Sequence, residues 1–252
     1  MEPTVYMGLL SDIGLLKEGW LGRLRRGVFR VAPDPVFNAF LRVFGRYIKN
    51  PYRPTFERTK TIFVHIPKTA GTSIAIALYN DSKPAHELLR EYQAYDPNRY
   101  NEYFKFTFVR NPYDRFVSGF SYLKQGGDGL YDPGWWEQFC SEVETLDDFI
   151  DNFKYNHSLY YLKRHLIFIP QVRYMRDLNG DIGLDFVGRL ETIREDIERL
   201  EELTGMTIDL QHRKKSKRKE LSEYMDNEKF VSFVNELYRE DFEQLGYDKA
   251  QV

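Results

Sequence analysis

Apolar and polar residues follow one another along the chain in a pattern that predicts strands alternating with helices. Short apolar runs of strand length occur three times, at residues 61–65, 104–110 and 186–188. Each is followed by a segment with helical periodicity, at residues 73–80, 113–124 and 192–203. This alternation favours a parallel β-sheet flanked by helices on both faces, so the predicted fold class is α/β.

Three further helices are expected between and after these units, at residues 86–95, 146–153 and 221–244. Residues 13–50 stand apart as a basic amphipathic region that Pro33 and Pro35 divide into two helices. Its apolar stripe consists of Phe37, Phe40, Leu41 and Phe44. Its basic residues, on other sides of the helix, are Arg42, Arg46 and Lys49.

Such a helix either packs against its own domain or rests on an anionic membrane surface. A stripe of phenylalanine and leucine is better suited to burial, so we expect packing and keep peripheral membrane contact as the alternative. The predicted organisation is a helical appendage over residues 1–58, followed by an α/β domain over residues 59–252.

Composition narrows the class of protein. Hydrophobic residues make up 42 % of the 252 residues, enough for a sizeable core. The net charge of −2 argues against nucleic acid as a partner. Residues 1–60 nevertheless carry 11 Lys and Arg against 5 Asp and Glu, which sets that stretch at +6 and the remainder at −8.

The single cysteine, Cys140, excludes an intrachain disulfide, and no motif around it indicates a nucleophile. No apolar stretch approaches the ~20 residues of a membrane span. The N-terminus has an early acid and no long apolar segment, which is atypical of a signal peptide. These features predict a cytoplasmic protein.

A candidate phosphate loop follows the first strand, with the sequence His65-Ile-Pro-Lys68-Thr-Ala-Gly71-Thr-Ser73. Gly71 permits close approach to a ligand, and the N–H groups that begin the next helix attract anions. Lys68 adds a positive charge, and Thr69, Thr72 and Ser73 add hydroxyl donors. In a Walker A loop the lysine follows the last glycine, whereas Lys68 precedes Gly71 by three residues. The loop therefore suits phosphate-like oxyanions without the usual arrangement for nucleotide and metal.

A second motif follows the second strand, Phe108-Val-Arg110-Asn-Pro-Tyr-Asp114-Arg-Phe-Val-Ser118-Gly-Phe. Arg110 stands at the carboxyl end of a parallel strand, where α/β sheets bind ligands. Ser118 lies two turns into the next helix, so an arginine fork and a hydroxyl can hold one phosphate from two sides. The alternative for Arg110 is a structural ion pair with Asp114.

Together the two motifs resemble those of sulfotransferases that use 3′-phosphoadenosine 5′-phosphosulfate (PAPS). The closest resemblance is to the carbohydrate sulfotransferases that include heparan sulfate 2-O-sulfotransferases and related bacterial proteins. It extends over roughly residues 60–247, because Ser216-Lys217-Arg218 and the helix ending Tyr-Arg-Glu-Asp-Phe-Glu-Gln-Leu-Gly-Tyr resemble the C-terminal region of that family. The resemblance implies a P-loop-like sheet, PAPS as co-substrate without a metal, and a saccharide acceptor.

The resemblance also implies roles for particular residues. The 5′-phosphosulfate would be held by Lys68, Thr69, Gly71, Thr72 and Ser73. The 3′-phosphate would be held by Arg110 and Ser118, and the nucleotide would be covered by Lys217 and Arg218. The last two could equally belong to a solvated basic run between Arg213 and Lys219.

Sulfuryl transfer to a hydroxyl needs a general base, and histidine suits this role near neutral pH. Related 2-O-sulfotransferases resemble this chain in having a catalytic histidine ahead of the second motif, which favours His86. His165 is the second candidate for the base, and its alternative role is contact with the acceptor. Glu87 and Glu91 are the carboxylate alternatives.

Acceptor binding is less defined by the sequence. Trp135 could stack on a sugar ring or be buried under its own helix. Two rival functions are a metal-dependent kinase, against which the position of Lys68 argues, and a module that binds a nucleotide without turnover.

Overall fold

The computed structural model describes residues 18–80, 85–127, 129, 132–157, 159–210 and 220–251. Its centre is a parallel three-stranded sheet in the order β1-β2-β3. The strands are β1 (Thr61–Phe63), β2 (Phe104–Val109) and β3 (Phe186–Arg189). Thr61 of β1 lies opposite Phe104, and Phe106 of β2 lies opposite Phe186. The predicted α/β fold and its three strands are therefore confirmed.

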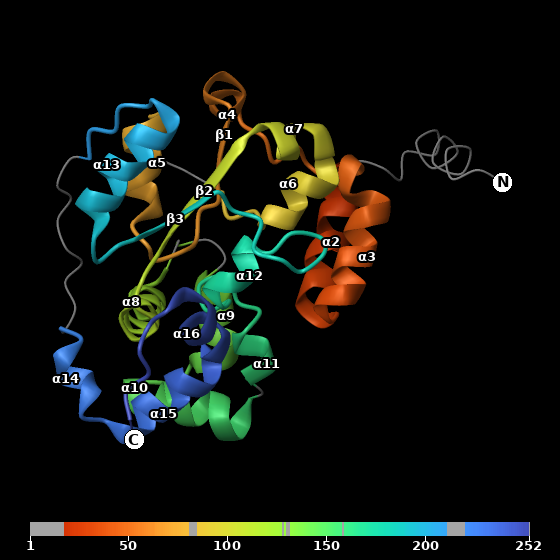
Figure 1. Cartoon of the computed structure of the whole chain (residues 1–252). Helices are drawn as coiled ribbons and strands as arrows, with labels where there is room; N and C mark the ends of the chain where they lie inside the picture. The colour runs from red at the N-terminus through yellow and green to blue at the C-terminus, as the bar shows by residue number, and fades with distance from the viewer. Residues whose placement is uncertain are drawn as a thin grey trace.

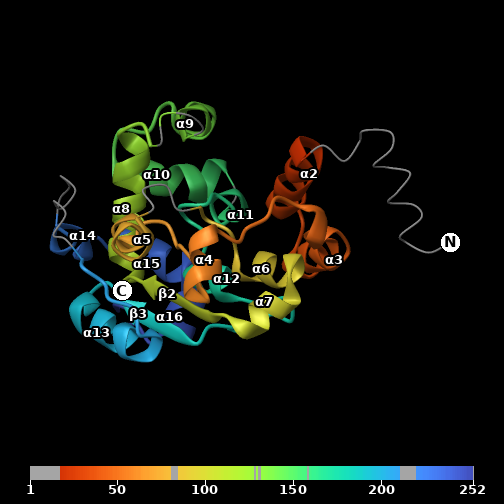
Figure 2. The same cartoon turned by 90° about the horizontal axis from the view of Figure 1, so that it is seen from above.

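Helices flank the sheet (Figures 1 and 2). Those of the first half are α2 (Glu18–Val31), α3 (Asp34–Phe44), the 3-10 turn η1 (Gly45–Tyr47), α4 (Pro54–Thr59), α5 (Gly71–Tyr79), α6 (Leu89–Tyr95), α7 (Pro97–Glu102) and α8 (Pro112–Lys124). The second half contains α9 (Asp132–Cys140), α10 (Leu146–Asp151), the π-helical η2 (Asn152–Asn156), α11 (Leu159–Leu162), α12 (Gln171–Met175), α13 (Ile193–Thr204), α14 (Ser222–Met225), α15 (Glu228–Leu237) and α16 (Arg239–Leu245).

Local capping decides where several helices begin. Asn111 caps α8 by accepting hydrogen bonds from the N–H groups of Tyr113 and Asp114, and Pro112 occupies the first helical position. Helix α6 begins at Leu89, not at residue 86 as predicted, because the Glu91 carboxylate accepts the Leu88 N–H at 2.8 Å. Residues 85–88, which include His86, are consequently not helical.

The C-terminal region also differs from the prediction of one helix over residues 221–244. It forms three helices, α14, α15 and α16, separated by breaks at residues 226–227 and at Tyr238. Asn227 starts α15 by accepting the Phe230 N–H at 3.1 Å. Asn favours the N-cap of a helix over its interior, so a new helix begins at this residue. The apolar periodicity of residues 221–244 runs across this break and therefore does not reveal it.

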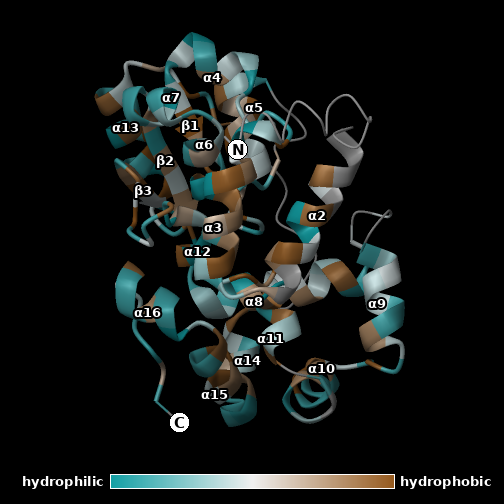
Figure 3. Ribbon diagram, turned by 90° about the vertical axis from the view of Figure 1, so that its right-hand side faces the viewer, coloured by the Kyte–Doolittle hydropathy of each residue, from teal (hydrophilic) through white to brown (hydrophobic). Residues whose placement is uncertain are grey.

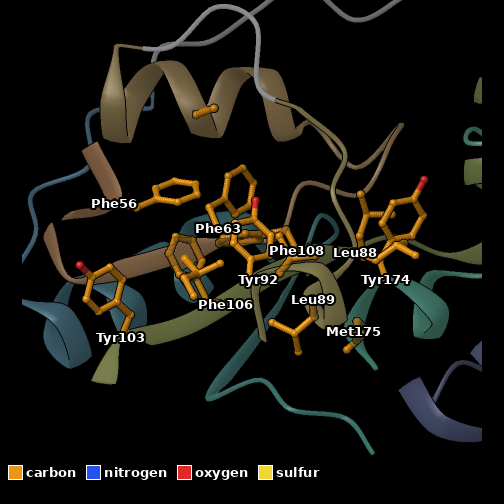
Figure 4. Packing of buried hydrophobic residues seen from close by; sticks show 14 of the residues in the cluster. Phe56, Phe63, Leu88, Leu89, Tyr92, Tyr103, Phe106, Phe108, Tyr174 and Met175 are labelled. Atoms are coloured by element: carbon orange, nitrogen blue, oxygen red, sulfur yellow. The ribbon is translucent and has the colours of Figure 1, made fainter. Parts of the chain in front are cut away.

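Two hydrophobic clusters form the core. The first surrounds the sheet and joins β1 and β2 to α5, α6 and residues 174–175 (Figure 4). The second joins α8, α10, α15 and α16 beyond the end of β2 that leads into α8 (Figure 1). Cys140 is buried in this second cluster, and burial raises the pKa of its thiol to about 12. A buried thiol of this kind is inert packing.

Helices α2 and α3 pack on the domain through the predicted apolar stripe. Phe37 and Leu41 are fully buried, and Phe40 and Phe44 are partly buried against the same cluster as the sheet. Ion pairs reinforce the contact. Asp34 pairs with Arg90 (3.5 Å) and Arg173, and Arg25 pairs with Glu91.

Candidate active site

The segment after β1 forms the predicted phosphate loop. The chain stays extended through Val64, whose N–H donates to the Phe106 carbonyl at 2.9 Å, and then turns before α5. Two residues of this turn have left-handed backbone conformations, Lys68 (φ 71°) and Ala70 (φ 61°). Non-glycine residues seldom adopt this conformation, and such strain gathers at ligand sites. The loop leads directly to the N-terminus of α5, the end of a helix that attracts anions.

The threonines and the serine of the loop divide into two groups. Thr69 is buried, and its hydroxyl donates to the Ile66 carbonyl at 2.9 Å, so this side chain braces the turn. Thr72 and Ser73 lie half-buried in the first turn of α5. The Ser73 N–H donates to the Ala70 carbonyl, so the hydroxyl is the group that Ser73 can offer to a ligand.

Gly71 is required by a neighbouring side chain. A Cβ atom at this position would lie 1.8 Å from Cδ2 and 2.2 Å from Nε2 of His65. The sequence had assigned the close approach at Gly71 to a ligand, but in the structure the imidazole of His65 occupies that space. His65 is itself buried and stacks on Phe63 with ring centroids 5.9 Å apart.

Lys68 extends toward α8. Its Nζ lies over the ring of Tyr122, 4.0 Å from the ring centroid, in a cation–π contact. Ser118, the predicted 3′-phosphate ligand, lies one turn earlier on the same helix and is 7 % exposed. The structure therefore directs the loop lysine to the helix that carries the second motif.

Arg110 joins the two motifs. Its Nη1 donates to the Lys68 carbonyl at 3.1 Å, and its Nε donates to Oδ2 of Asp114 at 2.8 Å. Nη2 also pairs with Asp114. The structural ion pair considered as the alternative is thus present, and the same guanidinium still reaches the phosphate loop.

The backbone of Arg110 is held by residues whose role the sequence did not reveal. The Gln171 side chain accepts the Arg110 N–H at 2.9 Å and donates to the Arg110 carbonyl at 2.8 Å. Asp241 in turn accepts the N–H groups of Gln171 (2.9 Å) and Val172 (3.0 Å). Gln171 and Asp241 are fully buried. Asp241 belongs to the C-terminal segment quoted for the family resemblance. Through this network, that segment supports the backbone of Arg110.

Arg115 is a second anchor that sequence reasoning missed. It is fully buried, its Nε donates to the Pro67 carbonyl at 3.1 Å, and its Nη2 donates to the Ile167 carbonyl at 2.9 Å. Its guanidinium also lies 5.5 Å from the ring centroid of Tyr238. One side chain therefore fixes the phosphate loop against α8 and against the segment that follows His165.

His86 lies beside the loop with a defined tautomer. Its Nδ1 is 3.1 Å from the His65 carbonyl oxygen, and the two imidazole centroids are 4.3 Å apart. A carbonyl oxygen only accepts, so Nδ1 carries the proton, and in the neutral ring Nε2 carries the lone pair. Burial lowers the pKa of His86, and the positive charges of Arg53, Lys68 and Arg115 lower it further, whereas the bond to His65 opposes the shift. The lowered pKa favours the neutral imidazole, which is the form that can accept a proton.

The two carboxylates considered as alternatives have different surroundings. Glu91 is committed to structure, because its carboxylate caps α6 and pairs with Arg25. Glu87 is half-buried, and burial together with the charge of Glu91 raises the pKa of its carboxyl group. Glu87 remains the carboxylate alternative to His86.

His165 occupies a separate position near α9. Its Nε2 lies 3.6 Å from Oδ1 of Asp132, and its ring centroid lies 4.3 Å from that of Trp135. Trp135 also stacks on Phe153, with centroids 5.6 Å apart and planes 5° apart, so one of its faces is used in packing. The Asp132 partner was not anticipated from the sequence, since it becomes a neighbour only through the tertiary fold.

Some predictions fall outside this description. Lys217 and Arg218 lie outside the described residues. Among the residues that are described, no group of three or more His, Cys, Asp or Glu side chains is arranged to hold a metal ion. Within the same residues, no helix has the length and apolar character needed to span a membrane.

The fold and this site define a P-loop-like α/β protein in which a lysine-bearing loop joins the first strand to the N-terminus of α5. The sulfotransferase family matches residues 55–248, which is most of the chain, and the protein therefore belongs to the sulfotransferase family. No curated protein and no solved structure matches the chain. Sulfuryl transfer is thus the general activity of this class of protein.

Proposed function

We propose that the protein transfers a sulfuryl group from PAPS to a hydroxyl group of a saccharide, with His86 as the general base. The observation that carries the proposal is the hydrogen bond from Arg110 to the Lys68 carbonyl (3.1 Å), which unites the two phosphate-binding motifs in one site. PAPS has a phosphate at its 3′ position and a phosphosulfate at its 5′ position. A site with one cation for each of these groups fits that nucleotide.

The residues of the loop and of α8 suit this ligand. Lys68 and the N-terminus of α5 would bind the 5′-phosphosulfate, while Arg110 and Ser118 would bind the 3′-phosphate. Arg110 is now paired with Asp114, so a 3′-phosphate would have to compete with that carboxylate. When bound, PAPS supplies the sulfuryl group and a phosphate leaving group.

His86 has the protonation state that a base requires. Its Nε2 lone pair takes the proton of the acceptor hydroxyl as that oxygen bonds to sulfur and the bond from sulfur to the 5′-phosphate oxygen breaks. Lys68 stabilises the negative charge that grows on this leaving oxygen, an interaction stronger in the transition state than in the ground state. The products are the sulfate ester and 3′-phosphoadenosine 5′-phosphate (PAP).

The acceptor would lie on the side of His165 and Trp135. Arg115 connects the carbonyls of Pro67 and Ile167, so the segment after His165 runs beside the phosphate loop. An aromatic ring next to an imidazole suits the face and the hydroxyl groups of a sugar. The resemblance to carbohydrate sulfotransferases supports the same class of acceptor.

The direct test is transfer of radiolabelled sulfate from PAPS to a panel of polysaccharides and small hydroxyl compounds, with EDTA present. Thermal shifts with PAP and with ATP complete it, since a ligand that binds only the folded state raises stability. We expect transfer to a saccharide and a larger shift with PAP, because ATP lacks the 3′-phosphate. Equal shifts or a strict Mg²⁺ requirement would favour a kinase, and PAP binding without turnover would favour a binding module.

A further inference from the structure

Helix α3 leaves a second apolar stripe on its outer side. Phe37 and Leu41 face the core, whereas Val36 is 53 % exposed, Val43 is 62 % exposed and Tyr47, in η1, is 40 % exposed. Positions 36, 43 and 47 recur at helical spacing, so these side chains line one face. We call Val36, Val43 and Tyr47 the outer face of α3. Figure 3 views the molecule from the side on which α3 lies.

The outer face lies within a stretch of one charge sign. Residues 35–56 contain three arginines and one lysine and no aspartate or glutamate. Arg46 and Lys49 are exposed beside Tyr47. Arg42 is also exposed and donates to the Asn179 side chain at 2.9 Å. Asp34, the acidic residue that starts α3, is paired with Arg90 and Arg173 of the domain.

The distribution of charge over the whole chain strengthens this asymmetry. Residues 1–60 have a formal charge of +6, and the remaining residues have −8. An anionic surface would therefore attract the N-terminal stretch that contains α3 more strongly than the remainder of the chain. Exposed aliphatic side chains with a tyrosine and flanking basic residues are typical of segments that lie in the membrane interface.

We propose that the outer face of α3 binds the surface of an anionic lipid bilayer. A second copy of the chain is a poorer occupant, because a two-fold dimer through this face would bring the basic residues of both copies together, and like charges repel. Three exposed side chains also cover much less than the roughly 800 Å² per partner that stable complexes bury. A bilayer supplies both an apolar interior for Val43 and phosphate charges for the basic residues.

Binding in this orientation keeps the two sequence motifs away from the bilayer. Helix α5, which follows the phosphate loop, and helix α8, which carries Ser118, lie away from α3 in both views of Figures 1 and 2. The proposal is also independent of the reaction, since none of the residues of the outer face belongs to the phosphate loop or to the second motif.

Co-sedimentation of the full chain with lipid vesicles tests the proposal. We expect binding to vesicles that contain phosphatidylglycerol, no binding to pure phosphatidylcholine, and weakening as salt is raised. Arg46→Glu/Lys49→Glu should lower partitioning at least about 25-fold, from roughly fivefold for each basic residue lost. Val43→Asp should also lower it, while both variants keep the wild-type melting temperature and PAP binding.

Leu203→Asp is the matched control, because Leu203 is 56 % exposed on α13, on the opposite side of the molecule (Figure 1). It should bind vesicles as the wild type does. Absence of binding to anionic vesicles, or equal binding by the wild type and the α3 variants, overturns the proposal. Sedimentation velocity provides a second measurement: a dimer that Val43→Asp dissociates, without vesicle binding, would make this face an interface between copies.

Discussion

The role of Gln171 can be tested by removing its amide while keeping its length, as in Gln171→Met. The Gln171 side chain makes two hydrogen bonds to the backbone of Arg110, at 2.9 and 2.8 Å, and a longer one of 3.4 Å to Asp241. Methionine can make none of them. The N–H and the carbonyl of Arg110 would then lose their partners at the carboxyl end of β2.

The structure sets the scale of the effect. A buried polar group left without a partner lowers the free energy of unfolding by about 1–3 kcal/mol. Because Arg110 is only partly buried, we expect its N–H and carbonyl together to lower it by about 2–4 kcal/mol. For a chain of this size, such a loss lowers the melting temperature by roughly 5–15 °C. If Arg110 binds the 3′-phosphate, its displacement also removes a charge-assisted hydrogen bond, which corresponds to about 10- to 100-fold in PAP affinity.

Thermal denaturation and titration with PAP and ATP measure the two effects separately. We expect Gln171→Met to weaken PAP binding and leave the weaker ATP binding nearly unchanged. Gln93→Met is the control, because Gln93 also holds a backbone group, accepting the Leu178 N–H at 2.7 Å, but lies on α6. It should lower the melting temperature without changing PAP affinity. A wild-type ratio of PAP to ATP affinity in Gln171→Met would refute the positioning of Arg110 by Gln171.

Four further changes probe the site directly. His86→Ala should lower kcat roughly 10²–10⁴-fold, retain PAP affinity and remove the acidic limb of the pH–rate profile, which burial sets below the ordinary histidine pKa of 6.5. The pKa of His86 is lower in the folded protein than in the unfolded chain, so the unfolded chain binds a proton more readily. The free energy of unfolding in urea should therefore also fall as the pH drops below 6.5. His165→Ala should instead raise the KM for the acceptor, and abolished turnover in that variant alone would exchange the two roles. Lys68→Ala should lower kcat by about a hundredfold, the effect of losing one transition-state donor; an increase in KM alone would make it only a binding residue. Gly71→Ala should destabilise the loop by about 1–3 kcal/mol in thermal unfolding, because its Cβ would overlap His65, and an unchanged melting temperature would show that the ring moves freely.

Local patterns in the sequence determined the general architecture. Three short apolar runs became three parallel strands, because strands that pack between other elements, as β1 and β2 do, are apolar along most of their length. The loop between Lys68 and Ser73 and the segment from Arg110 to Ser118 were visible because their residue types and spacing carry their chemistry. The family assignment confirms the general conclusion drawn from them, sulfotransferase, and leaves the saccharide acceptor and the catalytic base as proposals.

Helix ends were less accessible to such patterns. The predicted helix includes residues 86–88, yet these residues are not helical, and the carboxylate of Glu91 accepts the Leu88 N–H where α6 begins. The break at Asn227 divides a region whose periodicity suggests one helix. A single side-chain hydrogen bond to a backbone N–H is enough to decide where a helix begins. The pattern of apolar residues contains no information about that bond.

Only the tertiary structure decided which side chains surround the two motifs. Gln171 and Asp241 are 61 and 131 residues from Arg110 along the chain, yet they hold its backbone through one buried network. The same holds for Arg115, which fixes the loop by a bond to the Pro67 carbonyl, and for His86, whose tautomer depends on the His65 carbonyl. A hydrogen bond to a backbone carbonyl is independent of the identity of the residue that carries it, so the sequence contains no pattern that marks the partner. The fold alone brings these groups together.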